Sequence, residues 1–228
     1  GCAPIALKCY PHLRERFQVF AVDVLAQPNK SAETRLSMKD ESYGVWLNEV
    51  MAGLDIEEAT LAGFSFGGLV ILKTLIHNKK RVKEAFLAAP AYIVNGNPIE
   101  ALFKVLIPMK RFIRKQNPKF IDKFLSVLFT EKDDFAAKFL PKVFSHFTMD
   151  FSPLPVLHKK EAQQINTPIT LIAAQKDIFF PGKKMIKRAQ KLLPSLKRTV
   201  LLDQSRHVQN SEDNRMIERL VMESSRGA

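Results

Sequence analysis

The chain has 228 residues and a net charge of +12, with 46% hydrophobic and 25% charged residues, which is ordinary for a globular protein. No apolar run is long enough for a membrane span, and the basic residues are scattered without a nucleic-acid-binding motif. We therefore expect no membrane span and no specific nucleic-acid partner.

The first residues, GCAPIALKCYPH, contain no basic segment followed by an apolar core, so they do not predict a signal peptide. The cysteines Cys2 and Cys9 are seven residues apart, too far along a helix for an easy disulfide. We expect reduced thiols and a cytoplasmic protein. Residues 4–15 have the pattern of a surface helix interrupted at Pro11.

Two elements are predicted before the central motif. Residues 18–24 (QVFAVDV) form a nearly continuous apolar run, rich in β-branched and aromatic side chains. This is typical of a strand that is covered on both faces in a parallel sheet. After a polar loop, apolar side chains recur every three or four residues from Tyr43 to Leu54, which predicts an amphipathic helix.

The central motif is the G-x-S-x-G sequence GFSFG at residues 63–67, preceded by a short apolar run at residues 59–62 and followed by apolar residues at helical spacing. A strand, a sharp turn and a helix in this order hold the serine, Ser65, at an exposed and strained apex. We expect the small residues Gly63 and Gly67 to allow the close approach of strand and helix.

The rest of the chain continues this alternation with one interruption. Residues 92–162 carry Phe, Leu, Ile and Lys at helical spacing, punctuated by prolines, which predicts an inserted helical subdomain. Further strands are predicted at residues 82–89, 170–174 and 198–202, and further helices at residues 182–193 and 210–223.

Alternating strands and helices predict an α/β fold with a mostly parallel sheet, right-handed crossovers and helices on both faces. We assign residues 1–91 and 163–228 to this α/β core and residues 92–162 to the insertion.

Three residues with complementary chemistry follow predicted strands, in the order Ser65, Asp177 and His207. Ligands bind where the carboxyl ends of parallel strands meet. A serine hydroxyl needs an adjacent base, an imidazole titrates near neutrality, and a carboxylate fixes the imidazole tautomer. Asp203 is the competing acid, but it lies only four residues before His207, and we expect it to point away.

Attack on an acyl carbonyl creates an oxyanion that requires backbone N–H donors. The amide of Phe66 follows the nucleophile directly and lies at a helix N-terminus, so it suits this role. No His or Cys residues form a close pair, so metal ligation has no support and we expect no cofactor.

At these motifs the chain resembles the α/β-hydrolase fold family, and particularly its small bacterial carboxylesterases. The matching segments are GFSFGG at residues 63–68, AAQKDIFFP at residues 173–181 and SRHV at residues 205–208. The resemblance implies that Ser65 is the nucleophile, His207 the base and Asp177 the orienting acid. It also implies that residues 92–162 form a helical cap that shapes the substrate pocket.

The chain differs from this family at its start. Family members have three strands before the first helix, and the third ends in His-Gly just ahead of an oxyanion residue. Gly1 resembles that glycine, so the resemblance implies that the amide of Cys2 completes the oxyanion hole. We therefore expect a piece of a longer enzyme that lacks its N-terminal strands, with unpaired backbone beside residues 18–24 or 59–62.

The favoured hypothesis is a serine hydrolase that cleaves a small or medium-sized carboxylic ester through an acyl-enzyme, with that ester as its partner. Two alternatives stay open. The same triad serves C–C bond, lactone or amide hydrolysis and acyl transfer, and some members of the fold bind ligands without turnover. The basic residues of the insertion, such as Lys110 and Arg114, are interpreted as a solvated helix face. No oligomeric state is predicted.

Overall fold

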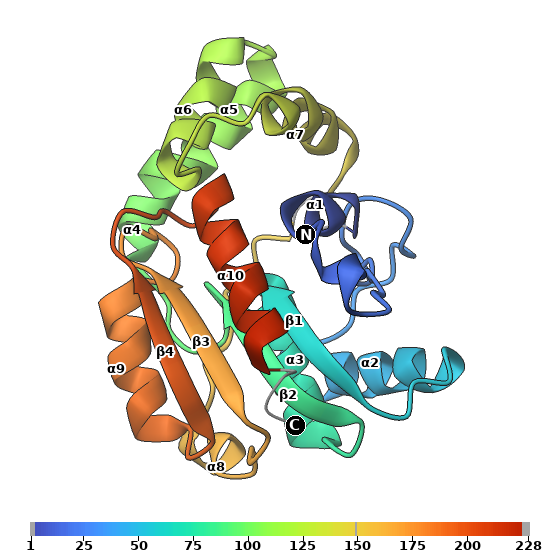
Figure 1. Cartoon of the computed structure of the whole chain (residues 1–228). Coiled ribbons are helices and arrows are strands. Elements are labelled where there is room, and N and C mark those ends of the chain that lie inside the picture. Colours follow the sequence, from blue (N-terminus) through green and yellow to red (C-terminus); the bar gives the residue numbers. More distant parts are fainter. Residues whose placement is uncertain (1–2, 149, 225–228) are drawn as a thin grey trace.

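A four-stranded parallel sheet stands at the centre of the computed structural model, which describes residues 3–148 and 150–224 (Figure 1). The strands follow one another in the spatial order β1-β2-β3-β4, so each pairs with its neighbours in the sequence. They are β1 (Ala59–Phe64), β2 (Val82–Ala88), β3 (Ile169–Ala174) and β4 (Leu196–Leu202). The predicted α/β fold with a parallel sheet is confirmed.

Helices cover both faces of the sheet (Figure 1). Successive strand residues point to opposite sides, and in β2 the side chains on both sides are apolar and buried. Ala85 and Leu87 of β2 belong to a core formed with α2, α3 and α9, whereas Phe86 and Ala88 pack towards α10 and η1. The helices around the sheet are α1 (Ala3–Cys9), the 3₁₀ turn η1 (Leu13–Glu15), α2 (Ser42–Gly53), α3 (Phe66–His77), α9 (Gly182–Leu192) and α10 (Ser211–Ser224).

The strand predicted at residues 18–24 is wrong, because this segment belongs to no strand in the structure. Val19, Phe20 and Val22 are among the exposed large apolar residues. A strand needs a neighbour for its backbone N–H and C=O groups. Within the described residues, the free edge of β1 is left unpaired and residues 18–24 pair with no strand, so their backbone lacks the ladder that a strand needs. The expectation that further strands precede Gly1 stays a prediction.

Between β2 and β3 the chain forms a group of short helices above the carboxyl ends of the strands (Figure 1). Their buried side chains, such as Met109, Phe112, Phe124 and Phe144, form a hydrophobic cluster of their own. These elements are α4 (Pro98–Ala101), the π-helical turn η2 (Leu102–Leu106), α5 (Ile107–Lys115), α6 (Pro118–Leu128) and α7 (Asp134–His146). The short helix α8 (Lys159–Ala162) lies instead at the opposite end of the sheet, near the start of β3, and its Ala162 belongs to the core that contains α3 and α9 (Figure 1).

Close packing between β1, α3 and the end of β2 fixes the turn that carries Ser65. A Cβ on Gly63 would lie 2.6 Å from the Ile71 Cδ1 atom and 2.8 Å from the Gly67 carbonyl oxygen. A Cβ on Gly67 would meet no atom within 4 Å, so Gly67 is not small for the steric reason that the sequence suggests. Gly68 is instead the tight position, since its Cβ would collide with Pro90.

We expect Gly68→Ala to lower the free energy of unfolding by about 1–3 kcal/mol, the usual cost of overpacking. The added methyl would lie 2.9 Å from the Cα atom of Pro90, whose ring is part of the chain and has little freedom to move. The control is Gly67→Ala on the same helix turn, which should cause no loss of stability. Urea unfolding of both variants checks this, and equal effects would contradict it.

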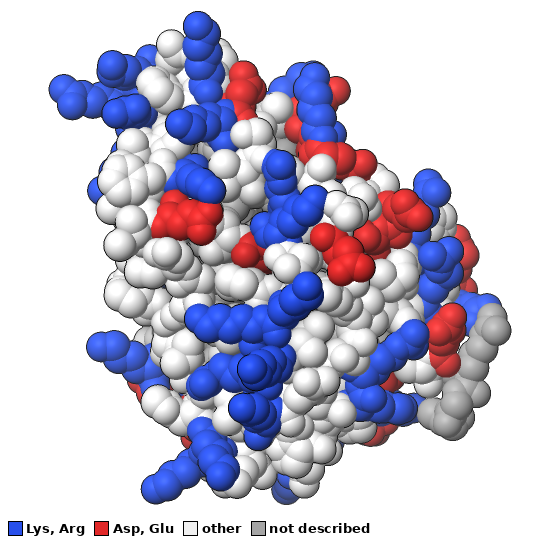
Figure 2. Space-filling model, turned by 90° about the vertical axis from the view of Figure 1, so that its left-hand side faces the viewer, with Lys and Arg blue, Asp and Glu red and all other residues white. Residues whose placement is uncertain are grey.

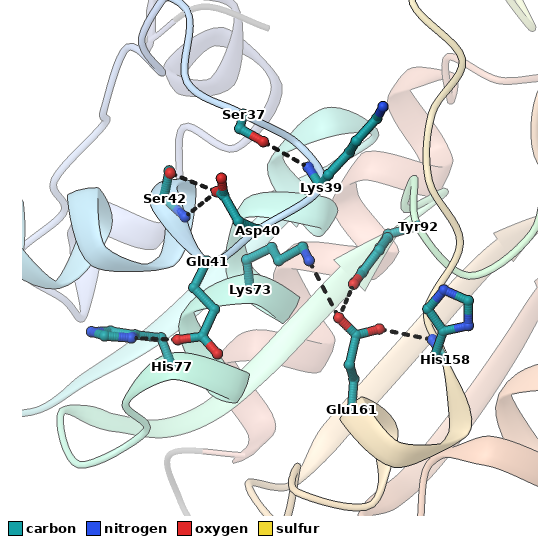
Figure 3. Close-up of polar contacts among 10 residues, drawn as sticks. All are labelled: Ser37, Lys39, Asp40, Glu41, Ser42, Lys73, His77, Tyr92, His158 and Glu161. Atoms are coloured by element: carbon teal, nitrogen blue, oxygen red, sulfur yellow. Dashed lines mark hydrogen bonds and ion pairs between the residues drawn. The ribbon is translucent and has the colours of Figure 1, made fainter.

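A buried charge pair ties α3 to the segments that enter and leave the inserted helices (Figure 3). The Lys73 side chain is 2% exposed, and its Nζ lies 3.4 Å from Oε1 of Glu161, whose side chain is 26% exposed. The Tyr92 hydroxyl donates to the same oxygen at 2.7 Å, and the backbone N–H of His158 donates to Oε2 at 2.9 Å. The Lys73 ammonium also lies 4.6 Å from the centroid of the Tyr92 ring.

Burial raises the pKa of Glu161, but the donors His158 and Tyr92 and the charge of Lys73 outweigh it, so the net pKa is lowered. The stability from this carboxylate is therefore complete above the ordinary Glu pKa and is lost as the pH falls through the lowered folded-state pKa.

We expect Glu161→Gln to cost about 3 kcal/mol in unfolding free energy, because it leaves the Lys73 cation buried without a carboxylate. Lys73→Met should cost less, since Glu161 keeps two donors and reaches solvent. The double variant should recover most of the Glu161→Gln loss. Chemical denaturation of the three variants checks the order, and a Lys73→Met variant less stable than Glu161→Gln would contradict it.

The surface is rich in cations on the face that carries α9 (Figure 2). The helix itself contributes Lys183, Lys184, Lys187, Arg188 and Lys191 and no acidic residue. Among the described residues, no helix is both long and apolar enough to cross a membrane.

Candidate active site

The turn after β1 holds Ser65 in a backbone conformation that L-residues rarely adopt, with φ 51° and ψ −116°. Its N–H donates to the Ala88 carbonyl of β2 at 3.0 Å, and its carbonyl accepts from the N–H groups of Gly68 and Ala91, both at 2.9 Å. Three backbone hydrogen bonds, to β2, to α3 and to the loop after β2, therefore stabilise the strained conformation of Ser65. The hydroxyl is left free to contact the loops beyond the sheet.

His207 connects Ser65 to Asp177 in a continuous chain of hydrogen bonds. The Nε2 atom of His207 lies 3.0 Å from Ser65 Oγ, and its Nδ1 atom lies 2.8 Å from Asp177 Oδ2. The side chains of His207 and Asp177 are 8% and 0% exposed. The structure thus brings together the three residues predicted from separate strand ends, from positions 65, 177 and 207 of the chain.

Asp177 is itself fixed by the backbone that follows it. Its other oxygen, Oδ1, accepts from the N–H groups of Phe179 and Phe180 at 2.8 and 3.1 Å. A carboxylate with both oxygens in use has one orientation towards the imidazole. With the Asp177 carboxylate accepting at Nδ1, the neutral ring presents the unprotonated Nε2 to the serine hydroxyl.

Three phenylalanine rings surround the His207 imidazole. The centroids of Phe64, Phe179 and Phe180 lie 5.0, 5.1 and 5.5 Å from the imidazole centroid. Phe64 immediately precedes the nucleophile, and the other two are the residues whose amides bind Asp177. These rings keep water away from the imidazole and strengthen its contacts with Ser65 and Asp177.

Of the two predicted oxyanion donors, Phe66 and Cys2, the structure describes Phe66. Phe66 is the first residue of α3, so its N–H has no acceptor in a preceding helical turn, as the role of oxyanion donor requires. The Phe66 ring packs edge-on against Tyr43 at a centroid distance of 5.2 Å, which turns it towards α2. Cys2 lies outside the described residues.

The other titratable candidates lie elsewhere. Asp203 is exposed in the turn after β4, and Asp177 makes the contact with His207. His12 and His77 pair with Glu15 and Glu41. Among the residues that the structure describes, no group of three or more His, Cys, Asp or Glu is arranged to hold a metal ion.

The packing of Phe64, Phe179 and Phe180 around His207 was not predicted from the sequence. Phe179 and Phe180 lie in the quoted motif around Asp177, and their position two and three residues after the acid was the available signal. Phe64 likewise sits inside G-x-S-x-G. Contacts between the inserted helices and the loop of His207 had no local signal, since they join residues about eighty positions apart.

Comparisons with known proteins agree with this architecture. The sequence model of the alpha/beta hydrolase fold family matches residues 7–139, a range that includes Ser65. An uncharacterized carboxylesterase, nap, of Bacillus subtilis (strain 168) is 33% identical over 85 residues, which cover 36% of this chain and 28% of the relative. Carboxylesterase YbfK of the same strain is 32% identical over 85 residues, covering 36% of this chain and 29% of the relative. Each alignment therefore spans less than a third of the curated relative.

A solved structure shows the same fold over nearly the whole chain. The crystal structure of naproxen esterase (carboxylesterase NP) from Bacillus subtilis matches with a TM-score of 0.75 at 21% identity, covering 95% of this chain and 78% of that one. The predicted resemblance is thus confirmed in both sequence and fold. Because the family model matches more than half of its residues, this chain belongs to the alpha/beta hydrolase fold family.

Proposed function

We propose that this protein is a serine hydrolase that cleaves carboxylic esters of small or medium-sized molecules. The observation that carries the proposal is the hydrogen-bonded chain from Ser65 through His207 to Asp177 on a strained strand-to-helix turn. The carboxylesterase names of the relatives nap and YbfK favour esters over other acyl compounds.

In the first half-reaction, Ser65 Oγ attacks the ester carbonyl carbon while its proton passes to His207 Nε2. Asp177 stabilises the resulting imidazolium at Nδ1. The bond to the alcohol oxygen then breaks, and the alcohol leaves with the proton from Nε2. An acyl group remains on Ser65.

In the second half-reaction, water attacks the acyl carbon and gives its proton to His207. The bond to Ser65 Oγ breaks, the serine recovers its proton, and the carboxylic acid leaves. The N–H of Phe66 donates to the oxyanion in both steps, and Cys2 is proposed as the source of the second donor.

We propose that residues 92–162 form one subdomain and that its helices α4 to α7 act as the cap over this site. Phe179 contacts both His207 and the hydrophobic cluster of these helices, so one side chain packs against both the proposed base and the proposed cap. Apolar side chains there suit the acyl or alcohol part of an ester.

Turnover of p-nitrophenyl esters with acyl chains of two to eight carbons tests the proposal, with p-nitroanilides and a vinylogous diketone as alternative substrates. We expect ester turnover to exceed amide turnover by orders of magnitude and to show a burst from acyl-enzyme accumulation. Turnover of the diketone alone would move the assignment to C–C bond hydrolysis. Binding of esters without release of product would contradict an enzymatic role.

A further inference from the structure

The loop that carries His207, residues 203–210 between β4 and α10, is held from outside the sheet by the end of α6. Phe129 and Val208 form an isolated parallel bridge. The N–H of Val208 donates to the Leu128 carbonyl at 2.8 Å, and the N–H of Thr130 donates to the Val208 carbonyl at 3.0 Å. The inserted helices therefore share backbone hydrogen bonds with the loop of the proposed base.

The Thr130 hydroxyl bonds the peptide groups on both sides of His207. It donates to the Val208 carbonyl at 2.6 Å and accepts from the Arg206 N–H at 3.0 Å. A hydroxyl has one proton to donate and lone pairs to accept, so both bonds are satisfied together. One side chain from the insertion thus bridges the residue before the base and the residue after it.

Other hydrogen bonds of the His207 loop come from the sheet side or from within the loop itself. On the core side, Lys176 N–H donates to the Ser205 carbonyl at 2.8 Å, and the Ser205 hydroxyl bonds Asp213. After the base, Gln209 donates to the His207 carbonyl from within the same loop. Among the described residues of the inserted helices and their connections, Thr130 is the one whose side chain bonds the residues on either side of His207.

We propose that Thr130 is a positioning residue for His207, and that through it the placement of the cap sets the orientation of the base. The inference rests on the proposed function, because it concerns the same His207. Without the hydroxyl, the Arg206 N–H loses its acceptor and the Val208 carbonyl keeps only the Thr130 N–H. The loop then samples positions in which Nε2 is no longer aimed at Ser65.

The test compares Thr130→Val, which keeps the shape and removes the hydroxyl, with Thr130→Ser, which keeps the hydroxyl. We expect Thr130→Val to lower kcat for an ester about ten- to a hundredfold with KM within about twofold, as for a small displacement of a catalytic group. Thr130→Ser should stay within about threefold of the wild type. The matched control is Ser126→Ala, which removes an exposed hydroxyl of α6 that, among the described residues, donates only to the Lys123 carbonyl of the same helix.

A second readout does not depend on turnover. The proton between His207 Nδ1 and Asp177 should give a low-field proton NMR signal. We expect it in the wild type, Thr130→Ser and Ser126→Ala, and expect it broadened or lost in Thr130→Val. This signal separates the two proposals: absence of ester turnover in the wild type would defeat the proposed function, while the signal would still report on positioning.

Unchanged kcat and an unchanged signal in Thr130→Val would overturn the inference, even if its melting temperature fell, because Thr130 would then serve stability alone. Loss in Ser126→Ala of the same size as in Thr130→Val would also overturn it. If Thr130→Val folds poorly, Thr130→Ala removes the same hydroxyl without a second methyl, and the same two outcomes apply.

Discussion

Replacing Ser65 by alanine is expected to lower kcat on esters by about 10⁶-fold, the loss measured when a triad nucleophile is removed. The reason is that His207 Nε2 would keep its geometry but would have no hydroxyl to deprotonate. Residual turnover would come from substrate binding and from stabilisation of the oxyanion by the Phe66 N–H, with water attacking the ester directly. Initial rates on the best p-nitrophenyl ester, for wild type and variant at equal concentration, measure this.

The control for this prediction is Ser152→Ala, an exposed serine on the return from the inserted helices. Its rate should match the wild type. Ester turnover in Ser65→Ala within tenfold of the wild type would mean that another group is the nucleophile, and the role proposed for Ser65 would be wrong.

Asp177→Asn is expected to lower kcat by about 10⁴-fold, with little change in KM. The Asn oxygen would keep the bonds from Phe179 and Phe180, which forces the amide NH₂ towards His207 Nδ1. An NH₂ group donates, so Nδ1 would have to accept and the proton would move to Nε2. An imidazole with a proton on Nε2 is unable to take the proton of Ser65.

Asp203→Asn is the matched control, since Asp203 is the other acid near His207 in the sequence and is exposed. It should leave kcat unchanged within about twofold. The opposite pattern, with activity lost in Asp203→Asn and retained in Asp177→Asn, would move the orienting role to Asp203.

Local patterns predicted the parts of the fold that depend on local physics. The turn at Ser65 and the strands on either side of it carry their pattern in consecutive residues, so the elbow and the parallel order followed from the sequence. The meeting of Ser65, Asp177 and His207 also followed, because carboxyl ends of parallel strands share one edge.

Features that depend on residues far away in the chain could not be predicted from the sequence. Residues 18–24 have the composition of a buried strand, but membership of a sheet requires a neighbouring strand, which a local pattern does not contain. In the sequence, Lys73 has the pattern of an ordinary polar residue of α3. Its burial depends on the carboxylate of Glu161, which lies eighty-eight residues later in the chain. Thr130 gives no signal at all before the fold places it against Arg206 and Val208.

The measurement that tests the central claim most directly is labelling of the protein with a fluorophosphonate, followed by peptide mass spectrometry. The hydrogen-bonded chain from Ser65 to Asp177 predicts one covalent adduct, on the peptide that contains Ser65, absent in Ser65→Ala and slowed about 10⁴-fold in Asp177→Asn. An adduct on another residue, or no adduct on a folded protein that still turns over esters, would contradict the account.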